Sequence, residues 1–364
     1  MSVSYGGSSI TFEDGSIVSS GSAGFKNKII NGAMMIDQRN GGATVTPLNG
    51  TYTLDRWKCS FAQASKFTVG QSSTAPTGFN NSLLATVASA YSITSTDYFL
   101  LSQKVEGFNC ADLGWGTANA KTVTLSFWVR SSVTGTFAVT ILNSANDRSY
   151  PATYTINAAN TFEYKTITIA GDTSGTWLTT NGIGLDIYWN LGTGSTYSGT
   201  ANAWQAGAYY SATGATSIVG TAGATFYLTG VQLEKGTTAS SFEFRSIQKE
   251  LMLCQRYFQK FENISGGEAT GSLATGIVWT STNFFTVVPY ITTMRALPTG
   301  TSSGSTAITL LVNGAAKQSS AITIQQFSKQ AFEIVGTSSS MTGGQAGFTR
   351  FTGSTDYIAL SAEL

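Results

Sequence analysis

The feature that most constrains the fold is an alternation of apolar and polar residues with a period of two. In TVTLSFWVRSS (122–132), Val123, Leu125, Phe127 and Val129 fall on one side of an extended chain. The intervening Thr, Ser, Trp and Arg residues fall on the other side. A strand with one apolar face is half-buried, as the strands of a β-sandwich are. The segment therefore predicts a strand with one side in a core.

The same alternation recurs along the chain in TFAVTIL (136–142), KTITIAG (165–171) and GIGLDIYW (182–189). Gly-containing turns such as Asn181-Gly182 separate these segments. No helical periodicity intervenes between the strands. Many short strands with turns at regular intervals are typical of an antiparallel sandwich. We therefore expect a jelly-roll β-sandwich over residues 27–243, in a protein that is mainly β.

One segment, SIQKELMLCQRYFQKF (246–261), has helical spacing instead. Its apolar residues recur at intervals of four and three, which is a heptad seam. They are Ile247, Leu251, Cys254, Phe258 and Phe261. The spacing predicts a linking helix within 244–262. Such a helix could pack on its own sandwich, or three copies could form a short bundle on a three-fold axis.

The last hundred residues return to the strand pattern. AITLLVNGAAKQ (307–318) contains Asn313-Gly314, which is the strongest two-residue signal for a hairpin turn. AITIQQF (321–327) and AFEIVGT (331–337) alternate like the earlier strands. We expect a second, smaller β-sandwich domain over 263–364. At the other end, residues 1–26 form a separate Gly- and Ser-rich segment with a short strand at Ile10-Thr11-Phe12.

The composition excludes several classes of function. Charged residues make up 11% of the chain, the net charge is +1, and Lys and Arg are scattered, so no nucleic-acid surface is expected. No apolar run reaches the roughly 20 residues of a membrane span. The chain has no His, and Cys59, Cys110 and Cys254 lie far apart. We therefore expect buried thiols, no metal site and no cofactor.

Cleavage of a polysaccharide is the main enzymatic alternative, and it needs two carboxyl groups at a defined separation. The acids on or beside predicted strands are Glu163, Asp172 and Asp186. Asp172 falls in a turn, where a carboxylate caps local amides. Glu163 and Asp186 fall on the outward face of their strands. The chain is therefore not expected to be an enzyme.

Sugar binding is the function that the aromatic residues favour. Flat rings pack on the apolar faces of pyranoses, and neighbouring polar groups bind the hydroxyls. The long connection 188–215 supplies both kinds of residue. Its candidate glycan-binding residues are Tyr197, Trp204, Gln205, Tyr209 and Tyr210. The alternative is that Trp204 and Tyr209 are core or trimer-contact residues. A second possible surface contains Trp279, Asn283 and Phe284.

Residues 225–258 carry a G-V-Q-L-E strand, a T-A-S-S-F-E linker and an E-L-M-L-C-Q-R-Y helix. This stretch resembles the segment that joins the β-rich parts of bacteriophage tail-fibre and receptor-binding proteins. KIINGAMMIDQRNGG (28–42) resembles the start of the jelly-roll module of that family, and MRALPTG (294–300) its C-terminal domain. The I-T-F-x-D-G unit near the N-terminus resembles the leading segments of phage fibres.

The resemblance implies a homotrimer in a virion, assembled in the host cytoplasm. Ile10 and Phe12 would lie in the segment that docks on other tail or baseplate proteins. The seam from Ile247 to Phe261 would form the trimer interface. The predicted function is attachment to the host-cell surface, through a surface glycan. The alternative is a structural virion component, such as a head fibre, a decoration protein or a tail adaptor, that binds no receptor.

Overall fold

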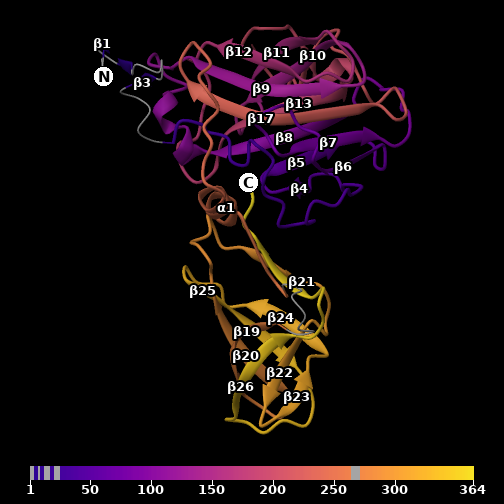
Figure 1. The fold of residues 1–364 in the computed structure, drawn as a ribbon, viewed down its shortest axis with the longest axis vertical. Helices are drawn as coiled ribbons and strands as arrows, with labels where there is room; N and C mark the ends of the chain where they lie inside the picture. Colours follow the sequence, from indigo (N-terminus) through magenta and orange to yellow (C-terminus); the bar gives the residue numbers. More distant parts are fainter. Residues whose placement is uncertain (1–3, 7–8, 12–16, 20–24, 264–270) are drawn as a thin grey trace. The chain divides into compact units, whose positions relative to one another are not determined.

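The computed structural model describes residues 4–6, 9–11, 17–19, 25–263 and 271–364, and the chain divides into two compact units. The N-terminal unit is Met1–Ser246, and the C-terminal unit is Ile247–Leu364. Figure 1 shows that strands dominate both units, with one short helix, α1, among the described residues. The prediction of a mainly β protein is confirmed.

The N-terminal unit is built on two antiparallel sheets that face each other. The seven-stranded sheet runs in the order β15 (Gln205–Ala206), β11 (Arg148–Ile156), β10 (Gly135–Leu142), β13 (Ile183–Thr193), β8 (Tyr98–Glu106), β5 (Trp57–Phe61) and β4 (Tyr52–Leu54). The five-stranded sheet runs in the order β12 (Glu163–Ile169), β9 (Val123–Ser131), β17 (Thr225–Lys235), β7 (Ser82–Val87) and β6 (Phe67–Ser72). These two layers are the expected sandwich.

Shorter elements complete this unit. The 3-10 turns are η1 (Gly107–Asn109), η2 (Ala111–Leu113) and η3 (Ser195–Tyr197). The connection after β13 contains a two-stranded parallel pair, β14 (Ser198–Gly199) and β16 (Ser211–Ala212). The N-terminal segment forms three strands, β1 (Ser4–Gly6), β2 (Ser9–Thr11) and β3 (Ile17–Ser19), where the sequence predicted one. Ile10 lies on β2, and Phe12 lies outside the described residues.

The core between the two sheets follows the predicted alternation. All four apolar residues of β9 named above are fully buried. Rings from opposite sheets meet across the core, with centroids 5.8 Å apart for Phe127 and Trp189 and 6.1 Å apart for Phe137 and Phe226. Such aromatic pairs add about 0.5–1.5 kcal/mol each beyond the burial of their area.

The first and last chain segments of the N-terminal sandwich are held together by polar contacts, which we call the terminal clasp. The Asn27 amide donates to the Glu243 carboxylate at 2.6 Å, and the Asn27 side chain donates to the Val231 carbonyl at 3.0 Å. The Arg245 guanidinium donates to the carbonyls of Asn27 and Ile29. The segment after β17 therefore folds back onto the segment that opens the sandwich.

The C-terminal unit also contains two antiparallel sheets. The smaller has the order β18 (Phe258–Glu262), β27 (Tyr357–Ser361) and β21 (Thr299–Ser302). The larger has the order β23 (Ala315–Gln318), β22 (Ile308–Val312), β26 (Ala346–Phe351), β19 (Ser272–Val278), β20 (Asn283–Pro289), β25 (Ala331–Thr337) and β24 (Ala321–Gln325). The predicted turn at Asn313-Gly314 joins β22 to β23, and both residues have the positive φ of a type I′ turn.

The helix is shorter than predicted. α1 spans Ile247–Gln255, and residues 258–262 are the strand β18, so the expectation of a helix to residue 261 is wrong. β18 pairs with β27, nearly the whole length of the unit away in sequence. This distant pairing satisfies backbone groups that a longer helix would have bonded internally. Phe258 and Phe261 therefore lie on a strand and do not continue the heptad seam.

Two further expectations concern the cysteines and the membrane. Cys59, Cys110 and Cys254 are all buried and form no disulfide, as expected. Burial raises the pKa of both Cys59 and Cys110 to about 12, which keeps these thiols protonated. Among the described residues, no helix is long and apolar enough to cross a bilayer.

Candidate functional site

The outer face of the N-terminal seven-stranded sheet carries a group of polar side chains at its centre. Along β13, Leu185, Ile187 and Trp189 point into the core, so Asp186 and Tyr188 lie on the opposite face. The register places Asp186 between Lys104 of β8 and Leu142 of β10. It places Tyr188 between Ser102 of β8 and Thr140 of β10.

Asp186 is on the outward face, as the sequence predicted, but it is not exposed. The residue is 4% exposed, and the Tyr188 hydroxyl donates to its Oδ2 atom at 2.6 Å. Its Oδ1 atom has no hydrogen-bond partner among the described residues. Burial raises the pKa of Asp186 to about 6, although the charges of Lys104 and Lys58 and the bond from Tyr188 act against it. The carboxylate is therefore ionised at neutral pH and has one free acceptor.

Three hydroxyls on the same face also lack partners. The side-chain oxygens of Ser102, Thr140 and Ser149 are buried and make no hydrogen bond to a described residue. Ser102 and Thr140 flank Tyr188, and Ser149 lies opposite Leu142, beside Asp186 in the register. Buried polar groups in folded proteins nearly always have partners. Together with the Asp186 Oδ1 atom, the three hydroxyls form an unsatisfied polar layer on this side of the sheet, which a ligand could reach only if the side chains that cover it moved.

A group of four half-buried tyrosines lies beside this surface, and we call it the tyrosine cluster. Its members are Tyr98, Tyr188, Tyr197 and Tyr210. Tyr210 contacts the other three, with ring centroids 5.0 Å from Tyr197, 5.3 Å from Tyr188 and 5.5 Å from Tyr98. Tyr197 and Tyr210 were predicted from the sequence as glycan-binding residues. Tyr98 and Tyr188 were not, although strand alternation places both on the outward face.

The remaining three predicted glycan-binding residues pack and bond within the protein, where they stabilise the connection after β13. Trp204 is half-buried against the core, its ring contacts three other aromatic residues, and its indole donates to the Ala170 carbonyl at 2.7 Å. Gln205 folds back to bond both the amide and the carbonyl of Thr200. The Tyr209 ring lies over Gly199, where a Cβ atom would be 2.7 Å from its Cγ. None of the three is in the tyrosine cluster.

The acids considered as a catalytic pair each have their own partners. Asp172 accepts two bonds from Arg148, at 2.7 and 2.8 Å. Glu163 pairs with Lys165 at 2.6 Å. Partial burial acts to raise the pKa of Glu163, but the bonds from Lys165 and from Asn157 and Ala158 lower it to about 2. Glu163 lies on β12 of the five-stranded sheet, whereas Asp186 lies on the seven-stranded one.

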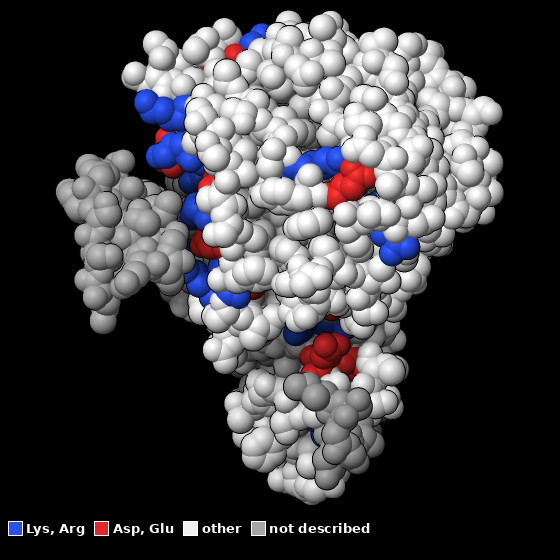
Figure 2. All heavy atoms as spheres, turned by 45° about the horizontal axis from the view of Figure 1, so that its top comes forward, with Lys and Arg blue, Asp and Glu red and all other residues white. Residues whose placement is uncertain are grey.

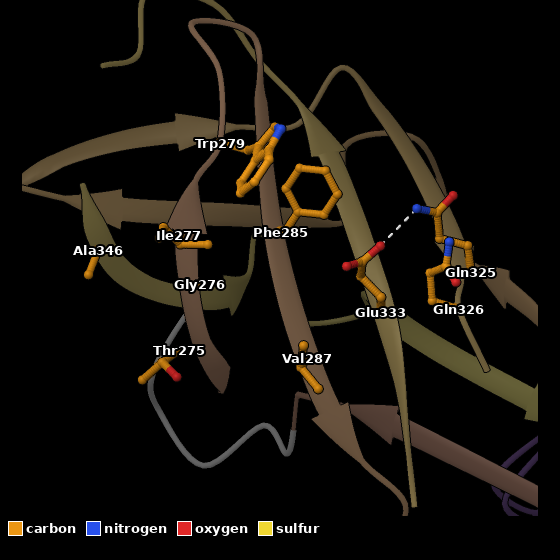
Figure 3. A pocket seen from close by; sticks show the side chains of 10 residues that line it. All are labelled: Thr275, Gly276, Ile277, Trp279, Phe285, Val287, Gln325, Gln326, Glu333 and Ala346. Atoms are coloured by element: carbon orange, nitrogen blue, oxygen red, sulfur yellow. Dashed lines mark hydrogen bonds between the residues drawn. The ribbon is translucent and has the colours of Figure 1, made fainter. Parts of the chain in front are cut away.

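The C-terminal unit carries a separate groove on its larger sheet, with a volume of about 750 Å³. In Figure 3, Trp279 and Phe285 lie side by side at one end, and Glu333 lies near Gln325 and Gln326 on the other side. Of the three residues expected at a second surface, Trp279 lines this groove, and Asn283 is half-buried at the start of β20. Phe284 is instead fully buried, because it points into the core.

Few charges are available for recognition at the surface. Much of the surface in Figure 2 is uncharged, since Lys, Arg, Asp and Glu make up only 11% of the chain. No group of three or more His, Cys, Asp or Glu residues that could hold a metal ion occurs in the described ranges. Hydroxyl, amide and aromatic groups are therefore the main means of recognition on this surface.

No family model matches the chain, and no curated protein is significantly similar to it. Among solved structures, the enzymatically active domain of tailspike protein 4 of bacteriophage CBA120 is 14% identical with a TM-score of 0.32; the match covers 58% of this chain and 21% of that one. A putative sugar-binding protein from Bacteroides thetaiotaomicron is 12% identical with a TM-score of 0.35, covering 58% and 100%. A family 11 carbohydrate-binding module from Clostridium thermocellum is 15% identical with a TM-score of 0.28, covering 53% and 96%.

Proposed function

We propose that this chain is a fibre protein of a bacteriophage particle and attaches the particle to a saccharide on the host-cell surface. The observation that carries the proposal is the tyrosine cluster beside the buried Asp186 on the outer face of the N-terminal sandwich. The resemblance of residues 28–42 and 225–258 to phage fibre proteins supports the particle to which we assign it.

The chemistry of the face suits a pyranose. Half-exposed tyrosine rings offer flat apolar surfaces for the C–H faces of a sugar, and their hydroxyls remain available for hydrogen bonds. The Oδ1 atom of Asp186 has no partner among the described residues but is shielded from solvent, so it would accept a bond from a sugar hydroxyl once the side chains that cover it move aside. A hydrogen bond to an ionised group is worth about 1.5–3 kcal/mol, roughly twice an ordinary one. The cluster would therefore supply stacking and the carboxylate would fix orientation.

We propose binding without cleavage. Hydrolysis of a glycosidic bond needs an acid and a second carboxylate on opposite sides of the bond. Asp186 has the raised pKa of an acid, but the other two acids considered are engaged by Arg148 and Lys165. The chain would therefore hold its saccharide and release it unchanged.

We further propose a homotrimer attached to the particle through residues 1–26. A single site of this kind binds weakly, because an exposed sugar ring makes few buried contacts. Three sites in one trimer, and several trimers on one particle, raise the effective affinity by about 10²–10⁴ without any new contact.

The test is binding of the full-length, fluorescently labelled chain to candidate host cells and to a printed panel of bacterial lipopolysaccharides and capsular polysaccharides. Tyr210→Ala is compared with Tyr164→Ala, which removes an exposed ring from the five-stranded sheet. We expect Tyr210→Ala to weaken binding about tenfold or more, equivalent to about 1.4 kcal/mol. We expect Tyr164→Ala to leave binding unchanged.

Three outcomes would contradict the proposal. If the folded wild-type chain binds neither cells nor the panel, the chain is a structural virion component. If soluble sugar fragments accumulate, it is an enzyme. Equal loss in Tyr210→Ala and Tyr164→Ala, with unchanged circular dichroism, would place the site elsewhere.

A further inference from the structure

Large apolar side chains lie exposed together on the outer face of the larger C-terminal sheet, and we call this surface the apolar face. They are Ile277, Trp279, Val287 and Phe348, with exposed fractions of 43%, 69%, 60% and 62%. They come from or directly follow three neighbouring strands, β26, β19 and β20. The half-buried Phe285 joins them, with its ring centroid 5.9 Å from that of Trp279.

The apolar face is not needed for the core of its own unit. Along β20, Phe284 and Val288 point inward, and Phe285 and Val287 point outward. The register places Phe285 opposite Ile277, and Ile277 opposite Ala346, so the apolar residues form a continuous band across the strands. Contiguous exposed apolar patches often mark interaction sites on folded proteins.

Opposite charges stand at the two sides of this band. Arg350 follows Phe348 on the same face of β26, and Glu333 faces outward from β25 beside Val287. β19 and β20 lie between them, and Arg350 is two residues further along its strand than the residue level with Glu333. At about 4.8 Å per strand and about 3.4 Å per residue, the two residues are about 16 Å apart and cannot pair. The Nε atom of Arg350 is buried and has no hydrogen-bond partner among the described residues. Glu333 accepts a bond from Gln325 at 2.8 Å.

We propose that the apolar faces of three copies pack together around the axis of the proposed homotrimer, with Arg350 of one copy meeting Glu333 of the next; this inference rests on the proposed function. Each chain carries one charge at either side of its apolar band, so the Arg350 side of one copy complements the Glu333 side of the next. Burial of the band would supply the affinity, and the charge pair would fix the register.

A second copy fits this groove better than a saccharide does. The floor of the groove in Figure 3 is aliphatic, with Ile277 and Val287, and its polar groups lie along one side. A sugar would leave most of its hydroxyls there without partners, and an unpaired buried polar group costs about 1–3 kcal/mol. The truncated helix strengthens the case, because the heptad seam ends at Cys254 and leaves little surface for association.

The test is the mass of the full-length chain in solution, measured by mass photometry across a dilution series. Glu333→Arg and Arg350→Glu are made singly and together, with Lys317→Glu as a charge reversal on β23, outside the face. We expect the mass of the wild-type protein in solution to correspond to more than one chain. Each single reversal should weaken association about tenfold or more, and the double variant should restore it, since the pair is re-formed with opposite sense.

A second variant, Val287→Glu, places a charge in the apolar band and should give monomers with an unchanged melting temperature. The inference is overturned if the wild-type chain is monomeric, or if Val287→Glu leaves the assembly intact. It is also overturned if Trp279→Ala abolishes saccharide binding while the mass is unchanged, because the groove is then a sugar site. The saccharide site on the N-terminal unit is tested separately, since monomeric Val287→Glu should keep its affinity per site.

Discussion

The Tyr188 hydroxyl donates a 2.6 Å hydrogen bond to Asp186, two residues earlier on the same strand. The bond orients the carboxylate so that one oxygen is occupied and the other is free. Burial also raises the pKa of Tyr188, so the phenol stays a donor across the physiological range. The two residues therefore act as a unit on the proposed saccharide-binding face.

The first prediction concerns pH. The folded pKa of Asp186 is about 6, above its ordinary value of 3.8, so the native state keeps a proton that the unfolded state has lost. Stability should therefore fall as the pH rises from about 4 to about 6, by about 3 kcal/mol for this group. Asp186→Asn should remove that slope. Urea unfolding of both proteins between pH 4 and pH 7 measures the difference, and identical slopes would contradict the assignment.

The second prediction concerns the terminal clasp. Glu243→Ala removes the acceptor of the Asn27 amide and a partner of Arg245, so it should destabilise the N-terminal unit by about 1–3 kcal/mol. Glu262→Ala removes a more exposed acid that pairs with Lys260 and should cost about 0–1 kcal/mol. Thermal and urea unfolding measure both. A smaller loss in Glu243→Ala than in Glu262→Ala would mean that the clasp contributes little.

The third prediction separates packing from recognition in the loop after β13. Trp204→Ala leaves a gap among Trp115, Trp177 and Tyr150, and it should lower the free energy of unfolding by about 3 kcal/mol. Trp204→Phe keeps a ring there, loses the bond to Ala170, and should cost about 1 kcal/mol. Its saccharide binding should equal that of the wild type. If Trp204→Phe folds normally but binds poorly, Trp204 itself contacts the sugar.

The fourth prediction uses a matched pair of glycines. A Cβ atom at Gly336 would lie 2.1 Å from the Phe284 ring, so Gly336→Ala should destabilise the C-terminal unit by about 1–3 kcal/mol. Gly304 has nothing within 4 Å of the same position, and Gly304→Ala should be neutral or slightly stabilising. Calorimetry of the two variants measures the contrast. Equal melting temperatures would show that the ring moves aside at no cost.

Local patterns were sufficient to predict the sandwich. Period two along β9, β10 and β13 identified the buried faces, because each residue's side of a strand depends only on its position in the alternation. The Asn-Gly turn between β22 and β23 was predictable for the same reason, since a positive φ is a local requirement. The helix end was not, because β18 exists through its pairing with β27.

The site was predictable only in part. The sequence identified Tyr197 and Tyr210 in an aromatic connection, but it could not distinguish them from Trp204, which packs inward. The burial of Asp186 depends on neighbours from β8 and β10, which are distant in sequence. The apolar face likewise becomes visible only when β26, β19 and β20 are placed side by side.

The terminal clasp has a mechanical consequence. Because Asn27 and Glu243 are bonded to each other, a pulling force that enters the sandwich at one end leaves it at an adjacent point. The two sheets lie to one side of the line between these two points and therefore carry little of the force. Tension applied between residues 27 and 243 would therefore load a few polar contacts and one end of β17, while the proposed saccharide-binding face keeps its shape.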